Sequence, residues 1–264
     1  MHPLLLKIGP IPIHTYGFMI AIGFICAMSL VKRLAARAGL DPERMMDLSF
    51  WCLVMGFAGC RVLFIITQLP QFLADPLAVF RVWEGGLVFF GGPLVAVPFG
   101  IWYTRKYKMS FINAMDCILP GLVLGHMFGR FGCLGAGCCY GKPTEMPWGI
   151  RLNSELVDAS MRGIPLHPTQ LYEASALFIL LLGLLWVFKH RKFQGQVSLT
   201  YFMAYPIIRS IIEIYRGDTV RGFVIQDVLS TSQFISILVF LAAFTALVVR
   251  MRKGNLIESK AKTR

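Results

Sequence analysis

Seven long apolar stretches dominate this chain, and they restrict its possible folds more than any other feature. A helix that crosses a bilayer needs about 20 mostly apolar residues. The composition, 56% hydrophobic with a mean hydropathy of +0.64, is too apolar for a soluble domain of this length. The sequence therefore predicts an all-α, polytopic integral membrane protein, a single membrane domain over 1–264 with seven transmembrane helices at 15–34, 46–68, 86–104, 111–132, 169–188, 196–216 and 225–249.

One long connection, residues 133–168, is too polar to cross a membrane. It begins with glycines and cysteines and continues through WGIRLNSELVDASMRGIPLHP. We expect this segment to form a small extracytoplasmic cap between the fourth and fifth transmembrane helices.

The basic residues are unevenly divided between the two sets of helix ends. Of the 26 Lys and Arg, sixteen flank one set, seven flank the other, and Arg61, Arg130 and Arg209 fall inside runs. Cytoplasmic loops of membrane proteins carry the excess of Lys and Arg. The pattern predicts a periplasmic N-terminus and a cytoplasmic C-terminus, and it accounts for the net charge of +12 without a nucleic-acid partner.

Ionisable side chains inside membrane spans are costly and usually face the interior of the helix bundle. With this orientation, six of them share the outer half of the membrane: Arg61, His126, Arg130, Glu173, Arg209 and Glu213. One interpretation is a buried ion network without a ligand, although such pairs stabilise poorly. We favour a cationic pocket, because three arginines face two carboxylates and a guanidinium matches phosphate geometry. The ligand that fits best is the head group of an anionic phospholipid.

Three cysteines follow the fourth run, at Cys133, Cys138 and Cys139. Zinc usually takes four protein ligands in structural sites, and only the distant His167 could join the three thiols. Outside the cytoplasm a disulfide such as Cys133–Cys138 is favoured over a metal. A nucleophilic cysteine stays open as a third interpretation.

Several motifs, in order along the chain, resemble the prolipoprotein diacylglyceryl transferases of bacterial inner membranes. IGPIPIHTYGFMIAIGF (8–24) resembles the family's opening with its Tyr-Gly pair, and FRVWEGGLVFFGG (80–92) its double-glycine loop. GRFGC (129–133) resembles the Gly-Arg-x-Gly-Asn signature, and HPTQLYEA (167–174) the His-Pro-Ser-Gln-Leu-Tyr-Glu motif. The sixth helix carries a similar polar stripe at Tyr205, Arg209, Glu213 and Arg216.

The resemblance implies an inner-membrane enzyme that moves the diacylglyceryl group of phosphatidylglycerol to the lipobox cysteine of a preprolipoprotein, releasing glycerol 1-phosphate. It implies no metal and no soluble cofactor. As catalytic residues we expect Arg130 and Arg209 on the phosphate, Tyr16 on the head group, and Glu213 holding Arg209. As substrate-binding residues we expect, besides the two arginines, Tyr205, Arg61, Gly129, Gly132, Glu173 and His167.

The chain departs from the family at three positions. Cys133 replaces the signature asparagine, Cys138 replaces an acidic residue, and Phe90 replaces a histidine that could accept a proton. Because neither replaced residue in the signature is a nucleophile, we expect the thiols to be structural.

Two other function classes remain as alternatives. A small transporter or channel would need polar residues through the whole membrane, whereas only Asp116 lies near the cytoplasmic side. A membrane thiol oxidoreductase would use Cys133, Cys138 and Cys139 as its reactive groups.

The orientation can be tested by labelling. A cysteine-reactive probe that cannot cross the membrane should reach a tag at Lys142 and should not reach tags at Lys106 or Lys192. Labelling of Lys192 from outside would overturn the helix assignment and the argument that the charges share one depth.

Overall fold

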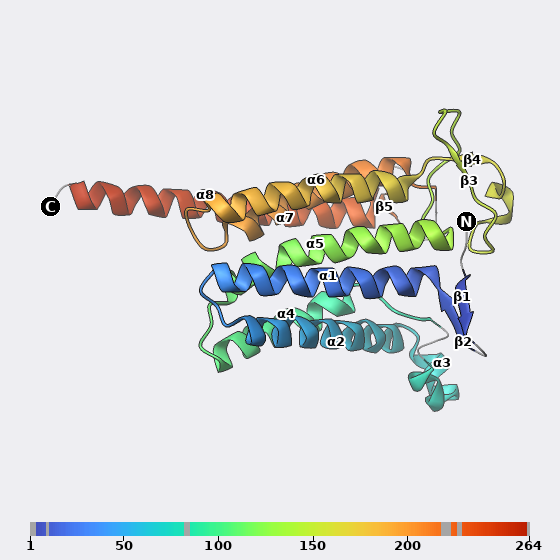
Figure 1. Cartoon of the computed structure of the whole chain (residues 1–264), viewed down its shortest axis with the longest axis horizontal. Coiled ribbons are helices and arrows are strands. Elements are labelled where there is room, and N and C mark those ends of the chain that lie inside the picture. The colour runs from blue at the N-terminus through green and yellow to red at the C-terminus, as the bar shows by residue number, and fades with distance from the viewer. Residues whose placement is uncertain (1–3, 9–10, 82–84, 218–222, 226–228, 263–264) are drawn as a thin grey trace. The chain divides into compact units, whose positions relative to one another are not determined.

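A computed structural model describes residues 4–8, 11–81, 85–217, 223–225 and 229–262 (Figure 1). Its long helices are α1 (Thr15–Arg37), α2 (Pro42–Thr67), α4 (Gly91–Lys106), α5 (Phe111–Ala136), α6 (Thr169–His190), α7 (Gln196–Tyr215) and α8 (Thr231–Lys262). Strands are few and short. The expected all-α membrane class is therefore confirmed, and the chain divides into two compact units that are described separately.

The number of transmembrane helices is one respect in which structure and sequence differ. Within the described residues, six helices are long and apolar enough to cross a membrane: α1, α2, α5, α6, α7 and the first part of α8. The third expected helix, 86–104, is α4, whose 16 residues extend about 24 Å and fall short of a bilayer core of about 30 Å. Seven crossings, in one membrane domain, remain a prediction.

The first unit, Met28–Ile118, is built around α2 and α4. Pro42 occupies the first turn of α2, and the Asp41 side chain accepts hydrogen bonds from the backbone N–H groups of Glu43 and Arg44, so the helix begins with a formed cap. Two further short helices, α3 (Leu69–Ala74) and η1 (Pro76–Phe80), follow α2. The sequence did not predict them.

Glycines bring the backbones of α2 and α4 together. A methyl group on Gly59 would collide with the carbonyl oxygen of Gly91, and one on Gly91 would collide with Gly59. Small residues at helix interfaces allow this close approach in membranes, where van der Waals packing drives association. Farther upstream, Gly85 and Gly86 have φ of 88° and 79°, so this backbone cannot be helical and α4 starts later than expected.

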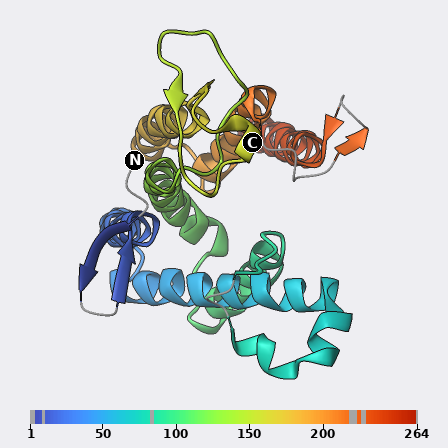
Figure 2. The same ribbon diagram turned by 90° about the vertical axis from the view of Figure 1, so that its right-hand side faces the viewer.

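The second unit, Met1–Ala27 and Leu119–Arg264, contains α6, α7 and α8, with α7 packed against both neighbours (Figure 2). Its N-terminal strands β1 (Leu4–Ile8) and β2 (Ile11–His14) form an antiparallel hairpin ahead of α1. A second hairpin pairs β5 (Phe223–Ile225) with β6 (Leu229–Ser230), so the last helix begins at Thr231 rather than at 225.

The segment after α5 folds over a small core of its own, made by Tyr140, Leu152, Val157 and Leu166. Strands β3 (Ile150–Arg151) and β4 (Pro165–Leu166) pair beside it, and η3 (Ala159–Met161) forms one 3₁₀ turn. This segment starts at Gly137, because α5 continues to Ala136 and includes Cys133. That it lies outside the membrane as a cap is still a prediction.

The α2–α4 contact gives a matched pair of variants. Gly59→Ala places a methyl group against backbone, so we expect a loss of about 1–3 kcal/mol in the free energy of unfolding. Gly56→Ala is the control, since its methyl group would meet Ala96 Cβ at an ordinary 3.7 Å. The measurement is thermal unfolding in detergent, and equal unfolding temperatures for both variants would contradict the predicted contact.

Candidate active site

Two helices of the second unit place a buried carboxylate against two basic side chains. Glu173, in the first turns of α6, is 1% exposed. Its Oε1 lies 3.0 Å from Arg130 Nη2 and 3.5 Å from His126 Nε2, both on α5. His126 and Arg130 are four residues apart and so lie on one face of the helix, which is why a single carboxylate can meet both.

Helix α7 adds a second pair to this group. Arg209 Nη2 lies 2.6 Å from Glu213 Oε2, one turn further along the helix, and both side chains are about nine-tenths buried. Tyr205 lies one turn before Arg209, with its ring 5.6 Å from that of His126, and its hydroxyl interacts electrostatically with Glu173. The polar stripe expected on this helix therefore faces the α5–α6 pair.

Some donor atoms of the two arginines lack a protein partner in the part of the chain that the structure describes. Arg130 Nε and Arg209 Nη1 are buried there and neither hydrogen-bonds nor ion-pairs with a described residue. Leaving a buried donor of a charged group unsatisfied is unfavourable. An anion that accepted from both would remove the penalty, and a phosphate has the oxygens to do so.

Arg61 is placed differently. It lies in the first unit, where all five of its N–H groups are used by backbone carbonyls: Nε by Val79, Nη1 by Gly85 and Gly86, and Nη2 by Ala78 and Arg81. The arginine thus holds the chain between η1 and α4. The sequence predicted that Arg61 belongs to the same cluster as the other buried charges. Those charges lie in the second unit and Arg61 in the first, so neither unit by itself contains that cluster.

The remaining expected residues surround α5 and the start of α6. Tyr16, at the start of α1, packs against Gly132, and electrostatic interactions couple it to Arg130 and the three thiols. Gly129 faces Ile20 at 3.7 Å. His167 bonds Tyr172 Oη at 3.1 Å in an aromatic group with Tyr215, apart from the Glu173 pair.

The three cysteines converge, and none of them forms a disulfide. The Sγ atoms of Cys133, Cys138 and Cys139 lie within 4.8 Å of one another, so the expected Cys133–Cys138 disulfide is absent and His167 is not part of the group. Hydrogen bonds from the Cys133 and Cys138 thiols lower the pKa of Cys139, and the Arg216 guanidinium lowers it further.

A helix-ending turn explains this convergence. The N–H of Gly137 bonds the Leu134 carbonyl and that of Cys138 bonds the Cys133 carbonyl, with Gly137 at φ 76°, which is a Schellman motif. Cys139 is itself left-handed, at φ 60°. The sequence did not show that this turn folds the later thiols back over Cys133.

Two side chains that sequence reasoning missed hold this turn in place. Gln170 Nε2 donates to the Cys138 carbonyl at 2.7 Å, and Thr169 Oγ1 donates to the Cys139 carbonyl at 2.8 Å. Both are buried at the start of α6. Their position in the HPTQLYEA motif, directly before Glu173, was the available signal.

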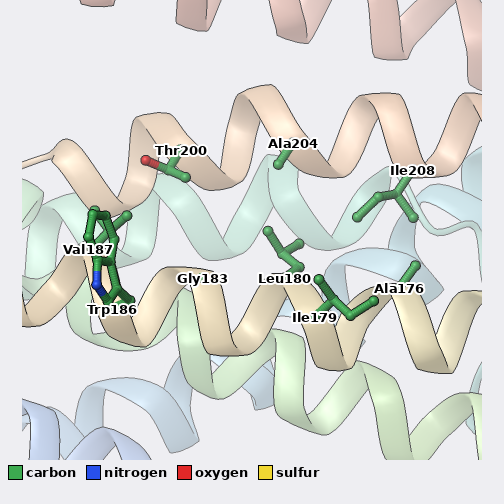
Figure 3. A pocket seen from close by; sticks show the side chains of 9 residues that line it. All are labelled: Ala176, Ile179, Leu180, Gly183, Trp186, Val187, Thr200, Ala204 and Ile208. Atoms are coloured by element: carbon green, nitrogen blue, oxygen red, sulfur yellow. The ribbon is translucent and has the colours of Figure 1, made fainter.

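An apolar groove of about 440 Å³ lies between α6 and α7, with no charged side chain in its lining (Figure 3). Its lining is hydrocarbon except for the Thr200 hydroxyl and the indole of Trp186. It offers no group for phosphate chemistry, and its character suits lipid chains.

The Glu173 pair can be tested by an isosteric change. Glu173→Gln keeps the shape but leaves Arg130 as a buried charge without a counter-ion, so we expect stability to fall by about 3–5 kcal/mol. The exposed Glu145→Gln is the control and should unfold like the parent chain. Unfolding in detergent measures both, and an unchanged midpoint for Glu173→Gln would show that the pair is not structural.

Comparison with known proteins gives a consistent result. Residues 3–249 match the family model described as "Prolipoprotein diacylglyceryl transferase". The chain is 34% identical over 250 residues to the phosphatidylglycerol–prolipoprotein diacylglyceryl transferase 2 of Clostridium perfringens, covering 94% of this chain and 95% of that one. It is 32% identical to the Clostridium tetani transferase (96% and 100% covered) and 33% to that of Bordetella bronchiseptica (91% and 92%).

Proposed function

The chain belongs to the prolipoprotein diacylglyceryl transferase family, and from this membership and its charged cluster we propose that it transfers the diacylglyceryl group of phosphatidylglycerol to a prolipoprotein. The acceptor is the thiol of the lipobox cysteine, the products are a thioether and glycerol 1-phosphate, and the reaction is the first step of lipoprotein maturation. The protein is a multi-pass protein of the bacterial inner membrane. We place its N-terminus in the periplasm and its C-terminus in the cytoplasm.

The observation that carries this proposal is the pair of unpartnered donors on Arg130 and Arg209. In the transfer, the acceptor sulfur forms a bond to the glyceryl carbon while the bond from that carbon to the phosphate oxygen breaks. The phosphate oxygen keeps the electron pair, so negative charge grows on the phosphate as it leaves. Buried guanidinium donors aimed at this charge stabilise the transition state.

The neighbouring side chains fit supporting roles. Glu173 anchors Arg130 through Nη2 and leaves Nε free for the phosphate, and Glu213 holds Arg209 in the same way. Tyr205 and Tyr16 supply hydroxyl groups beside these arginines that can orient the glycerol head group. The groove between α6 and α7 suits an acyl chain of the lipid.

The other expected residues take different parts in this proposal. Arg61 orders the chain ahead of α4 instead of binding phosphate, because backbone carbonyls use all its donors. Gly132 allows Tyr16 to approach α5 and so positions the tyrosine. We keep Gly129 and His167 as candidates at the edge of the lipid site. Transporter and thiol oxidoreductase functions find no support among the relatives.

The role of Arg130 is tested by a change that keeps its charge. Lysine has one nitrogen in place of the guanidinium fork, so it cannot hold Glu173 with one nitrogen and the phosphate with another. Arg130→Lys should therefore lower the transfer rate about 100-fold, equal to about 3 kcal/mol in the barrier. The assay is mass spectrometry of a lipobox peptide incubated with phosphatidylglycerol. Arg105→Lys, at the exposed end of α4, is the control.

Normal transfer by folded Arg130→Lys would show that the arginine is structural. Absence of a diacylglyceryl mass increase with the parent chain, under conditions where the Clostridium perfringens relative is active, would refute the proposed function itself.

A further inference from the structure

We propose that Cys133, Cys138 and Cys139 form a binding site for one zinc ion, whose fourth position takes the acceptor thiol of the prolipoprotein. The inference rests on the transferase activity proposed above and names the group that activates its acceptor. It replaces the expectation from sequence that the enzyme uses no metal.

The geometry of the thiols suits a metal better than a disulfide. Their Sγ atoms lie within 4.8 Å of one another. Thiolates on a tetrahedral zinc, with Zn–S of about 2.3 Å, are about 3.8 Å apart, so closing on the ion needs a movement of about 1 Å at most. A disulfide would use two of the three sulfurs and leave the third without a role.

The site is held by the backbone independently of any metal. The Schellman turn places Cys138 over Cys133, and the left-handed backbone at Cys139 directs the third thiol to the same point. Such a conformation is unfavourable for a non-glycine residue and persists where its surroundings enforce it. Buried Gln170 and Thr169 provide that support through the carbonyls of Cys138 and Cys139.

The site has three protein ligands and an opening. Among the described residues, no histidine, aspartate, glutamate or further cysteine joins the three thiols. Cys133 is buried, whereas Cys138 and Cys139 are partly exposed, so a ligand can approach from their side. Three protein ligands with one exchangeable position are typical of catalytic zinc, and four protein ligands are typical of structural zinc.

The charge around the site favours a thiolate-bound cation. Zinc with three thiolates carries one negative charge, and the buried Arg216 is hydrogen-bonded to Cys139. Arg130 stands three residues before Cys133 on α5 and interacts electrostatically with Cys133 and Cys139. The metal site would therefore adjoin the arginine that we assign to the phosphate.

The chemistry completes the transfer step. An acceptor thiol that binds zinc releases its proton to water and becomes a thiolate. A sulfur lone pair then attacks the glyceryl carbon, the S–C bond forms, the C–O bond breaks, and the phosphate leaves with the electron pair. The thioether product is uncharged and binds zinc weakly, so the next acceptor can replace it. The resembling family carries a possible proton acceptor where this chain has Phe90, and this site removes the need for one.

Metal binding is tested first, with cobalt(II) as a spectroscopic probe. The full chain in detergent, reduced and freed of metal, should bind one equivalent of cobalt(II) with an intense thiolate-to-cobalt charge-transfer band that zinc(II) abolishes. Cys133→Asn, Cys138→Ser and Cys139→Ser should each weaken binding by about 100-fold or more. Cys26→Ser, in α1 of the same unit, is the control and should bind normally.

The acceptor is tested on the cobalt-loaded enzyme. A lipobox peptide should add a fourth thiolate and raise the charge-transfer absorption, whereas the same peptide with serine in place of cysteine should leave the spectrum unchanged. Transfer activity should fall at least 10-fold on chelation and return with zinc(II).

Three results would overturn the inference: no stoichiometric binding by the reduced parent chain, an identical response to both peptides, or full transfer by the metal-free enzyme. The last of these leaves the transferase function intact. A chain that binds cobalt(II) and the cysteine peptide but never modifies the peptide would instead refute the proposed function.

Discussion

The carboxylate of Glu173 organises the polar centre of this protein. A charge that is 1% exposed must be matched within the protein, because desolvation is unfavourable by several kcal/mol per ion. Glu173, on α6, meets this requirement by accepting a hydrogen bond from Arg130 on α5. It also lies close to His126, which precedes Arg130 by one helical turn. Because one arginine nitrogen satisfies the carboxylate, the rest of the guanidinium is held rigidly and stays available. A lysine in this position would give its single nitrogen to both tasks.

The same stretch of α5 supports a second set of groups. Arg130 faces Glu173, and Cys133, three residues later, lies in the last turn, where the helix ends in a Schellman motif. The chain then runs between two other segments: Gly141 and Lys142 bond the backbone of His167 and Tyr215. This pairing carries Arg216, the residue after α7, towards Cys139. Local backbone rules and a few long-range hydrogen bonds thus bring arginines and thiols together at the ends of two helices.

What the sequence could predict follows from how local each feature is. The spans of α1, α2, α5, α6 and α7 were predicted within a few residues, since apolar length is a local property. Shared depth correctly grouped Arg130, Glu173 and Arg209, because helical spacing and orientation set depth along a span. The same reasoning could not place Arg61, whose partners are carbonyls exposed by a turn at Gly85 and Gly86. Nor could it show the meeting of the thiols, which depends on a left-handed residue and on two α6 side chains.

The charges of the second unit link the two sets of groups. Among the described residues of this cluster, Arg130, Arg209 and Arg216 contribute three positive charges in or directly after α5 and α7, and Glu173 and Glu213 contribute two negative ones. In the resembling family an acidic residue stands where this chain has Cys138, and it would supply a third negative charge. A zinc ion with three thiolates has a net charge of minus one and would restore the same balance. This charge would lie next to the buried Arg216, which interacts with Cys139. On this proposal, the cysteines at 133, 138 and 139 together replace a carboxylate with a metal–thiolate group, beside the arginine that we assign to the leaving phosphate.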